Sequence, residues 1–240
     1  MSPDELVRLG QEIVNAATER GALVRLYGGV AVYARCPSIE THASLQRTYA
    51  DLDLIASRPA WMMLPDLFIS RGFVMRQNTP AQAVFVRGEL TVDVRGSQFR
   101  EYHSFDLAPR LALAPLTLPL ADLLLLKLQR VHFRDKEIKD AIALLLDHRI
   151  TDGEGVEEID REYLYKLTNR NWGLWTTVFD NTVELEKILD HYIEPEEAQL
   201  VWRRIELIQE VMDGKGKSPR WWLRRIPNKR LKWYQEPKHQ

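Results

Sequence analysis

Two aspartates separated by one leucine constrain this chain more than any other feature. In Asp51-Leu52-Asp53-Leu54, acidic and apolar residues alternate, which is the pattern of a β-strand with one buried face. Asp51 and Asp53 therefore share one face of the predicted strand, while the leucines face the core. Neighbouring carboxylates repel each other unless a cation lies between them. Mg²⁺ is typically held by one or two such groups together with substrate phosphates.

A third aspartate lies in a similar strand-like run, Thr91-Val92-Asp93-Val94. Asp93 stands between two valines, so its side chain is predicted to point away from the core. If this strand pairs beside the acidic strand, three carboxylates converge, which is the ligand set of a two-metal phosphoryl-transfer site. The alternative is that the aspartates form only a solvated strand face.

A pair of glycines precedes the acidic strand. The pattern predicts a strand over residues 22–27, then Gly28-Gly29, then a short helix over residues 30–35. A Gly-Gly turn at the start of a helix exposes backbone N–H groups that suit a phosphate. The alternative is a tight turn without a ligand.

The order G-G-x-A, R-x-x-x-D-L-D and V-D-V resembles the polymerase-β-like nucleotidyltransferase superfamily. Within it the chain looks most like the AbiEii-type (abortive-infection toxin) and minimal nucleotidyltransferase branch, over roughly residues 20–147. The resemblance implies that the three aspartates hold two Mg²⁺ ions and carry catalysis. It also implies that Gly28 and Gly29 contact the phosphates of an NTP, and that Arg47 belongs to the nucleotide site.

The chain departs from the family pattern at two places. Tyr49 stands where the family often has Ser or Thr, two residues before the first aspartate, and residues 36–45 look like an inserted loop. Further on, residues 117–148 predict a long helix with a bend near Phe133. The resemblance implies that Lys127 on this helix contacts nucleotide phosphates, and the alternative is a lysine that extends from an apolar helix into solvent. Arg134 and Asp140 resemble a following R…D element of the family, or are ordinary helix residues.

The whole pattern predicts an α+β fold. A small mixed β-sheet nucleotidyltransferase core with helices on one side is expected over residues 1–150, followed by a helical C-terminal domain over residues 151–214. Residues 152–162 are acidic, contain two glycines and are predicted to form a linker. Residues 215–240 form a basic, tryptophan-rich tail.

Composition narrows the setting. Cys36 is the single cysteine, so no internal disulfide can form and a reducing compartment is indicated. The N-terminus lacks the basic start and apolar run of a signal peptide. The most apolar stretch, residues 111–126, is interrupted by Pro115 and Pro119 and is too short to span a bilayer. We therefore expect a cytoplasmic protein without a membrane partner.

Charge is distributed unevenly along the chain. Residues 215–240 contain nine Lys or Arg and one Glu, giving +8, which leaves −9 for the rest because the total is −1. Cations neutralise phosphates and aromatic rings stack on bases, so the tail is a candidate RNA or tRNA contact. The alternative is that its tryptophans dock on the protein itself.

Three functions stay open from the sequence. The first is a Mg²⁺-dependent nucleotidyltransferase that moves NMP from an NTP to an acceptor hydroxyl on RNA, tRNA or protein. The resemblance to the toxin branch adds a toxin–antitoxin or phage-defence role and an antitoxin partner. The second is a non-catalytic RNA-binding adaptor on the same fold, and the third is an aminoglycoside nucleotidyltransferase.

Overall fold

The computed structural model describes residues 1–153, 155–214, 216–226 and 228–236. These residues form an α+β fold, as predicted, and divide into two compact units. The first comprises residues 1–35, 47–100 and 104–119, and the second comprises residues 36–46, 101–103 and the chain from Leu120 onward. The expected domain boundary near residue 150 therefore falls inside the second unit.

The first unit begins with a helix whose start follows from its sequence. Helix α1 (Pro3–Thr18) has Ser2 as N-cap, and Ser2 and Glu5 form a reciprocal capping box. Gly21 terminates the following turn with φ of 74°, a conformation that glycine adopts without strain.

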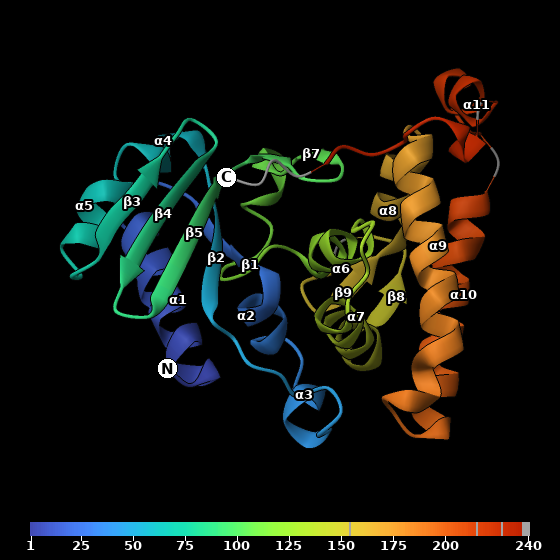
Figure 1. The fold of residues 1–240 in the computed structure, drawn as a ribbon, viewed down its shortest axis with the longest axis horizontal. Coiled ribbons are helices and arrows are strands. Elements are labelled where there is room, and N and C mark those ends of the chain that lie inside the picture. Colours follow the sequence, from blue (N-terminus) through green and yellow to red (C-terminus); the bar gives the residue numbers. More distant parts are fainter. Residues whose placement is uncertain (154, 215, 227, 237–240) are drawn as a thin grey trace. The chain divides into compact units, whose positions relative to one another are not determined.

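A mixed five-stranded sheet forms the centre of the first unit, in the order β1-β2-β5-β4-β3 (Figure 1). Strand β2 pairs antiparallel with β1 and parallel with β5, and the remaining neighbours are antiparallel. The strands are β1 (Val24–Tyr27), β2 (Asp51–Ala56), β3 (Val74–Asn78), β4 (Gln82–Arg87) and β5 (Leu90–Gly96).

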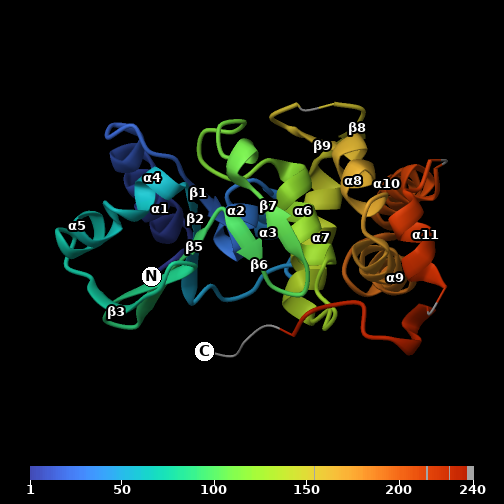
Figure 2. The same ribbon diagram turned by 90° about the horizontal axis from the view of Figure 1, so that it is seen from above.

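One face of this sheet is apolar and covered by helices. A Cβ on Gly10 of α1 would lie 2.8 Å from a methyl carbon of Leu26, so α1 packs directly on β1. Phe68 stacks on Phe85 of β4 with ring centroids 4.2 Å apart. Phe68 belongs to α5 (Leu64–Ile69), and Figure 2 shows α5 and α1 on the same side of the sheet. Asp53 pairs with Tyr27 next to the Leu26–Leu54 pair, so its side chain lies on the opposite face.

The remaining elements of the first unit are short. The segment before β3 forms two short helices and not one, because Pro65 starts a new helix and cannot continue the preceding one. These elements are α2 (Gly28–Tyr33), α4 (Arg58–Trp61), β6 (Gln98–Arg100), β7 (Ser104–Asp106) and η1 (Ala108–Arg110).

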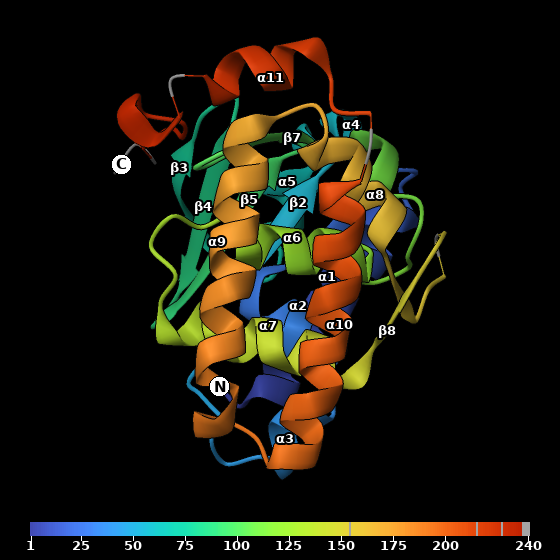
Figure 3. The same ribbon diagram turned by 90° about the vertical axis from the view of Figure 1, so that its right-hand side faces the viewer.

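The second unit is mainly helical. Helices α9 (Trp172–Ile188) and α10 (Pro195–Asp213) lie side by side and antiparallel, and α11 (Pro219–Arg225) crosses the end of α9 (Figure 3). Helix α6 (Leu120–Leu128) is buried along its whole length. The other elements are α3 (Ser38–Thr41), α7 (Asp135–Asp147), β8 (Arg149–Thr151), β9 (Glu158–Asp160), α8 (Arg161–Thr168), η2 (Leu189–His191) and η3 (Asn228–Arg230).

Three sequence-based expectations for this unit are corrected. The long helix over residues 117–148 is two helices, α6 and α7, separated by residues 129–134. The predicted linker over residues 152–162 contains β9, which pairs parallel with β8. The predicted loop over residues 36–45 contains α3, whose Ser38 donates to the Asp147 carboxylate at 2.8 Å.

No helix in the described part of the chain is both long and apolar enough to cross a membrane.

Candidate active site

Two of the three predicted aspartates are direct neighbours in the sheet. Strands β2 and β5 run parallel with Asp53 opposite Asp93, which confirms the expected pairing of the two strands. Adjacent strands lie about 4.8 Å apart, so both carboxylates project from the same place on the face opposite to α1 and α5. Asp51 is opposite Thr91, one pleat away on that face. Asp51 is exposed, and Asp53 and Asp93 are half-buried.

Asp93 is held by two residues that were not predicted to belong to the site. Gln82 Nε2 donates to both carboxylate oxygens of Asp93 at 2.9 Å. Arg95 Nε lies 3.4 Å from Asp93 Oδ2. Gln82 is opposite Arg95 across the β4–β5 pair, so all three side chains share one face. The sequence does show that Asp93 and Arg95 are two residues apart in a strand, which places their side chains on the same face.

The two glycines make room for charged side chains. Gly28 has φ of 73°, and a Cβ there would lie 2.0 Å from Asp53 Oδ2. A Cβ on Gly29 would lie 1.9 Å from Arg47 Nη2. Only glycine therefore allows the Asp53 carboxylate and the Arg47 guanidinium to lie this close to the backbone at the start of α2. The structure thus brings together Gly28, Gly29, Arg47 and Asp53.

Tyr49, the departure from the family pattern, supports Arg47. The Arg47 guanidinium carbon lies 4.3 Å from the centre of the Tyr49 ring, which is a cation–π contact. The Tyr49 ring in turn packs against Tyr33 of α2, with centroids 5.6 Å apart. A Ser or Thr at position 49 could not provide this surface.

The donor atoms at this face suit Mg²⁺, which prefers hard oxygen ligands. As the side chains are oriented, however, no group of three or more His, Cys, Asp or Glu among the described residues is arranged to hold a metal ion. The contacts of Asp93 with Gln82 and Arg95 explain part of this arrangement. Both oxygens of the Asp93 carboxylate are engaged by Gln82 in this arrangement.

Lys127 lies in the second unit and has a buried partner. Its Nζ is 2.7 Å from Asp140 Oδ2, and the two side chains are 10% and 1% exposed. Lys127 thus does not extend into solvent, as one alternative expected. Its predicted contact with nucleotide phosphate stays a prediction. Arg134 is the N-cap residue of α7.

The basic tail is partly docked. Trp221 is 4% exposed and packs edge-on against Trp175, with ring centroids 5.5 Å apart. The Trp233 indole N–H donates to Thr177 Oγ1 at 3.1 Å. Trp222, in contrast, is 50% exposed. The expected docking of tryptophans thus holds for two of the three, while positions 215, 227 and 237–240 lie outside the described residues.

Comparison with known proteins gives distant similarities. No family model and no curated protein matches the chain. The solution structure of the antibiotic-resistance factor ANT(2'')-Ia is similar with a TM-score of 0.42 and 15% identity, covering 60% of this chain and 84% of that one. The same factor in complex with adenylyl-2''-tobramycin gives 0.40 and 16%, covering 57% and 86%. A tRNA-processing enzyme in an apo form gives 0.32 and 13%, covering 91% and 61%.

Proposed function

We propose that the chain is a Mg²⁺-dependent nucleotidyltransferase of the polymerase-β-like superfamily, which transfers NMP from an NTP to an acceptor hydroxyl. The observation that carries this proposal is the position of Asp53, which faces Asp93 across the β2–β5 pair and lies against Gly28. Carboxylates beside an open backbone turn and an arginine provide a place for metal ions and phosphates together.

Each residue has a distinct role in this proposal. Two Mg²⁺ ions would neutralise the phosphates and activate the acceptor hydroxyl. Asp51 and Asp53 would hold both ions, and Asp93 would orient the acceptor and help take its proton. Gly28 and Gly29 would let the β- and γ-phosphates approach the backbone, with Arg47 adding positive charge. Catalysis of this kind depends mainly on positioning and electrostatic stabilisation.

Gln82 and Arg95 control the direction of Asp93 before substrate arrives. Gln82 bonds both oxygens of the Asp93 carboxylate, so it holds that group until a cation competes for it. The Arg95 guanidinium lies on the same face of the sheet and can bind a phosphate. The narrower proposal, a toxin of the AbiEii-type branch with an antitoxin partner and a cytoplasmic location, rests on the order of the motifs alone.

The test is thermal stabilisation by each NTP with and without Mg²⁺. A ligand at one hundred times its Kd adds about 2.7 kcal/mol to the free energy of unfolding. In the wild type, we expect NTP to stabilise the protein more with Mg²⁺ than without it. In Asp51→Asn/Asp53→Asn, this Mg²⁺-dependent gain should disappear. The control Asp190→Asn/Asp213→Asn removes the same charge from two exposed positions and should respond like the wild type. An unchanged response of the Asp51/Asp53 variant would contradict the site.

A pair of glycine variants tests the turn separately. Gly28 and Gly21 have almost the same φ, 73° and 74°, but a Cβ on Gly21 would meet no atom within 4 Å. Alanine should therefore cost each position about 1–2 kcal/mol of backbone strain. Only Gly28→Ala should also displace Asp53 and lose the Mg²⁺–NTP response. Equal NTP responses in the two variants would show that the Gly28 turn does not contribute to binding.

A further inference from the structure

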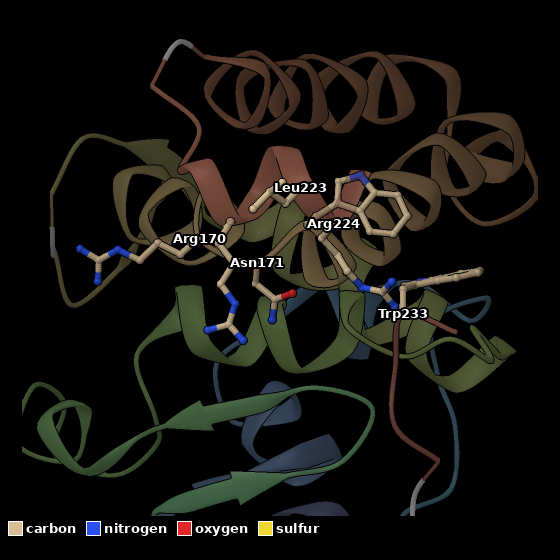
Figure 4. A pocket seen from close by; sticks show the side chains of 8 residues that line it. Arg170, Asn171, Leu223, Arg224 and Trp233 are labelled. Atoms are coloured by element: carbon tan, nitrogen blue, oxygen red, sulfur yellow. The ribbon is translucent and has the colours of Figure 1, made fainter. Parts of the chain in front are cut away.

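A pocket in the second unit combines arginines with aromatic and apolar surface. Its volume is about 500 Å³, and it lies between the start of α9, helix α11 and the segment around Trp233 (Figure 4). We call it the arginine pocket, and its principal lining residues are Arg170, Asn171, Arg220, Leu223, Arg224 and Trp233. This volume is in the range of pockets that bind small organic ligands.

In the described part of the chain, no carboxylate neutralises the charge of the arginine pocket. Three arginines line it, and no lining residue is acidic. Within the described residues, no carboxylate lies at ion-pair distance from Arg170, Arg220 or Arg224. Arg224 donates to the backbone carbonyl of Lys232, which fixes its direction without removing its charge. Guanidinium groups that form no ion pair with a carboxylate can donate hydrogen bonds to phosphate oxygens.

The walls of the pocket are fixed by tertiary contacts. A Cβ on Gly173 would lie 2.3 Å from the Trp233 carbonyl oxygen, so a glycine is needed for the Trp233 segment to approach α9. The Trp233 indole N–H is bonded to Thr177, and the buried Trp221 anchors α11. The tail therefore builds one side of the pocket.

The pocket also offers groups for a nucleoside. Asn171 Oδ1 accepts from the backbone N–H of Leu174, so the amide nitrogen of Asn171 is the atom left to donate to a ligand. Leu223 is 69% exposed, and Trp233 presents an indole, a ring on which a base can stack. In Figure 4, Arg224 and Trp233 lie beside each other, while Arg170 extends to the other side of Asn171.

We propose that the arginine pocket binds a nucleotide unit of single-stranded RNA, with arginines on the phosphate and the base against Trp233. The proposal extends the function above, because it identifies the class of acceptor as RNA. It depends on the pocket alone and needs neither NTP nor metal. RNA binding and nucleotidyl transfer can therefore fail separately.

The experiment measures anisotropy of a 3′-fluorescein-labelled oligouridylate with full-length protein, without NTP or Mg²⁺, at several salt concentrations. The variant Arg170→Gln/Arg220→Gln removes two exposed cations that make no hydrogen bond or ion pair with a described residue. We expect its Kd to rise about tenfold at low salt. The slope of log K against log salt should fall by about 1.4, because each contact with a single strand contributes about 0.7.

Two further variants make the result specific. Arg20→Gln/Arg203→Gln removes the same charge from exposed positions outside the pocket and should change Kd less than twofold. Leu223→Glu places a negative charge in the pocket at an exposed position, and should weaken RNA binding without lowering the melting temperature.

Three outcomes would overturn the proposal. These are wild-type affinity in both pocket variants, equal loss in the Arg20/Arg203 control, and full displacement of the RNA by UMP at an equal concentration of phosphate groups. The last would show that the pocket takes a free nucleotide and not a strand. Asp51→Asn/Asp53→Asn should retain RNA binding, so loss of nucleotide transfer with intact RNA binding would count against the proposed activity only.

Discussion

Lys127 and Asp140 form an ion pair between consecutive helices α6 and α7 of the second unit. Their 2.7 Å separation and near-complete burial mean that neither charge is stabilised by much bulk water. A buried charge is costly unless it is paired, so each residue depends on the other. The lysine that interrupts the leucine run of α6 is thus explained by a carboxylate thirteen positions later, which a search for apolar periodicity cannot identify.

Lys127→Met should lower the free energy of unfolding by about 3 kcal/mol, because it leaves the buried Asp140 carboxylate without its lysine. Lys127→Met/Asp140→Leu should recover most of the loss, since apolar replacement of both members of a buried pair is often neutral. The exposed pair Lys166–Glu162 provides the control, and Lys166→Met should cost less than about 0.5 kcal/mol. Urea unfolding checks all three, and wild-type stability of Lys127→Met would contradict the assignment.

The three aspartates stand out in the sequence, whereas the glutamine that orients Asp93 does not. Asp51 and Asp53 stand out because a strand has period 2 and carboxylates are rare on a face beside a core. Gln82 is recognised only through the β4–β5 register, which places its amide on Asp93. A glutamine at the start of a strand carries no such information in sequence.

At the scale of elements, local patterns predicted the strands better than the helix ends. Strand β2 begins at Asp51 and contains the predicted alternation, and the strand expected over residues 22–27 begins two residues later, at Val24. The end of α6 was missed because its cap comes from another helix. Asn181 Nδ2 of α9 donates to the carbonyls of Leu128 and Arg130, both at 2.8 Å. These bonds satisfy carbonyls that the helix leaves open, and they depend on tertiary packing.

The acidic stretch after α7 was missed for a related reason. Asp160 accepts hydrogen bonds from the backbone N–H groups of Glu162 and Tyr163, and so caps α8. The same carboxylate accepts from the backbone N–H of Gly153 at 3.2 Å. One aspartate thereby orders both the turn and the following helix. Composition alone, with acids and glycines together, predicts a linker.

Two adjacent tryptophans of helix α11 differ in burial, and we therefore expect them to differ in their contribution to stability. Trp221 is buried against Trp175, while Trp222 is half exposed. Trp221→Ala should lower the free energy of unfolding by about 3 kcal/mol, as deletion of a buried aromatic side chain does, and Trp222→Ala by less than about 1 kcal/mol. Thermal melting of both variants checks this difference. Equal losses would mean that α11 is not docked through Trp221.

At the scale of the whole molecule, segments that follow one another along the chain do not always belong to the same compact unit. Residues 36–46 and 101–103 belong with the helical second unit, although both are flanked by segments of the sheet-containing unit. A prediction from the sequence assigns consecutive segments to the same domain. The expected boundary at residue 150 could therefore not anticipate that α6 and α7 belong with the helices that follow.

The segment 101–103 introduces a buried histidine into the second unit. His103 is 4% exposed, and its Nε2 lies 3.0 Å from Thr177 Oγ1. Burial lowers the pKa of His103 from 6.5 to about 4. His42 differs, because hydrogen bonds to the Ser38 carbonyl and Glu197, with the nearby charges of Glu197 and Asp147, outweigh the opposing effect of burial and raise its pKa. The two histidines therefore give stability opposite dependences on pH.

His103 should make the protein sensitive to mild acid. Above pH 6.5 the histidine is neutral in the folded and unfolded states, whereas between pH 6.5 and about 4 only the unfolded state takes up the proton. Acidification across this window should therefore remove about 3 kcal/mol of stability, at about 1.4 kcal/mol per unit of pKa shift. His103→Gln keeps a polar group near Thr177 but cannot titrate, so its stability should fall less over the same range. Urea unfolding from pH 8 to pH 4 compares the two proteins, and parallel pH profiles would show that His103 is not buried in its neutral form.

His42 should change stability with pH in the opposite direction. Its raised pKa stabilises the fold below pH 6.5, and that contribution disappears as the pH rises through the pKa of the folded state. His42→Gln should therefore lose stability relative to the wild type at low pH and not at high pH, which the same urea series measures.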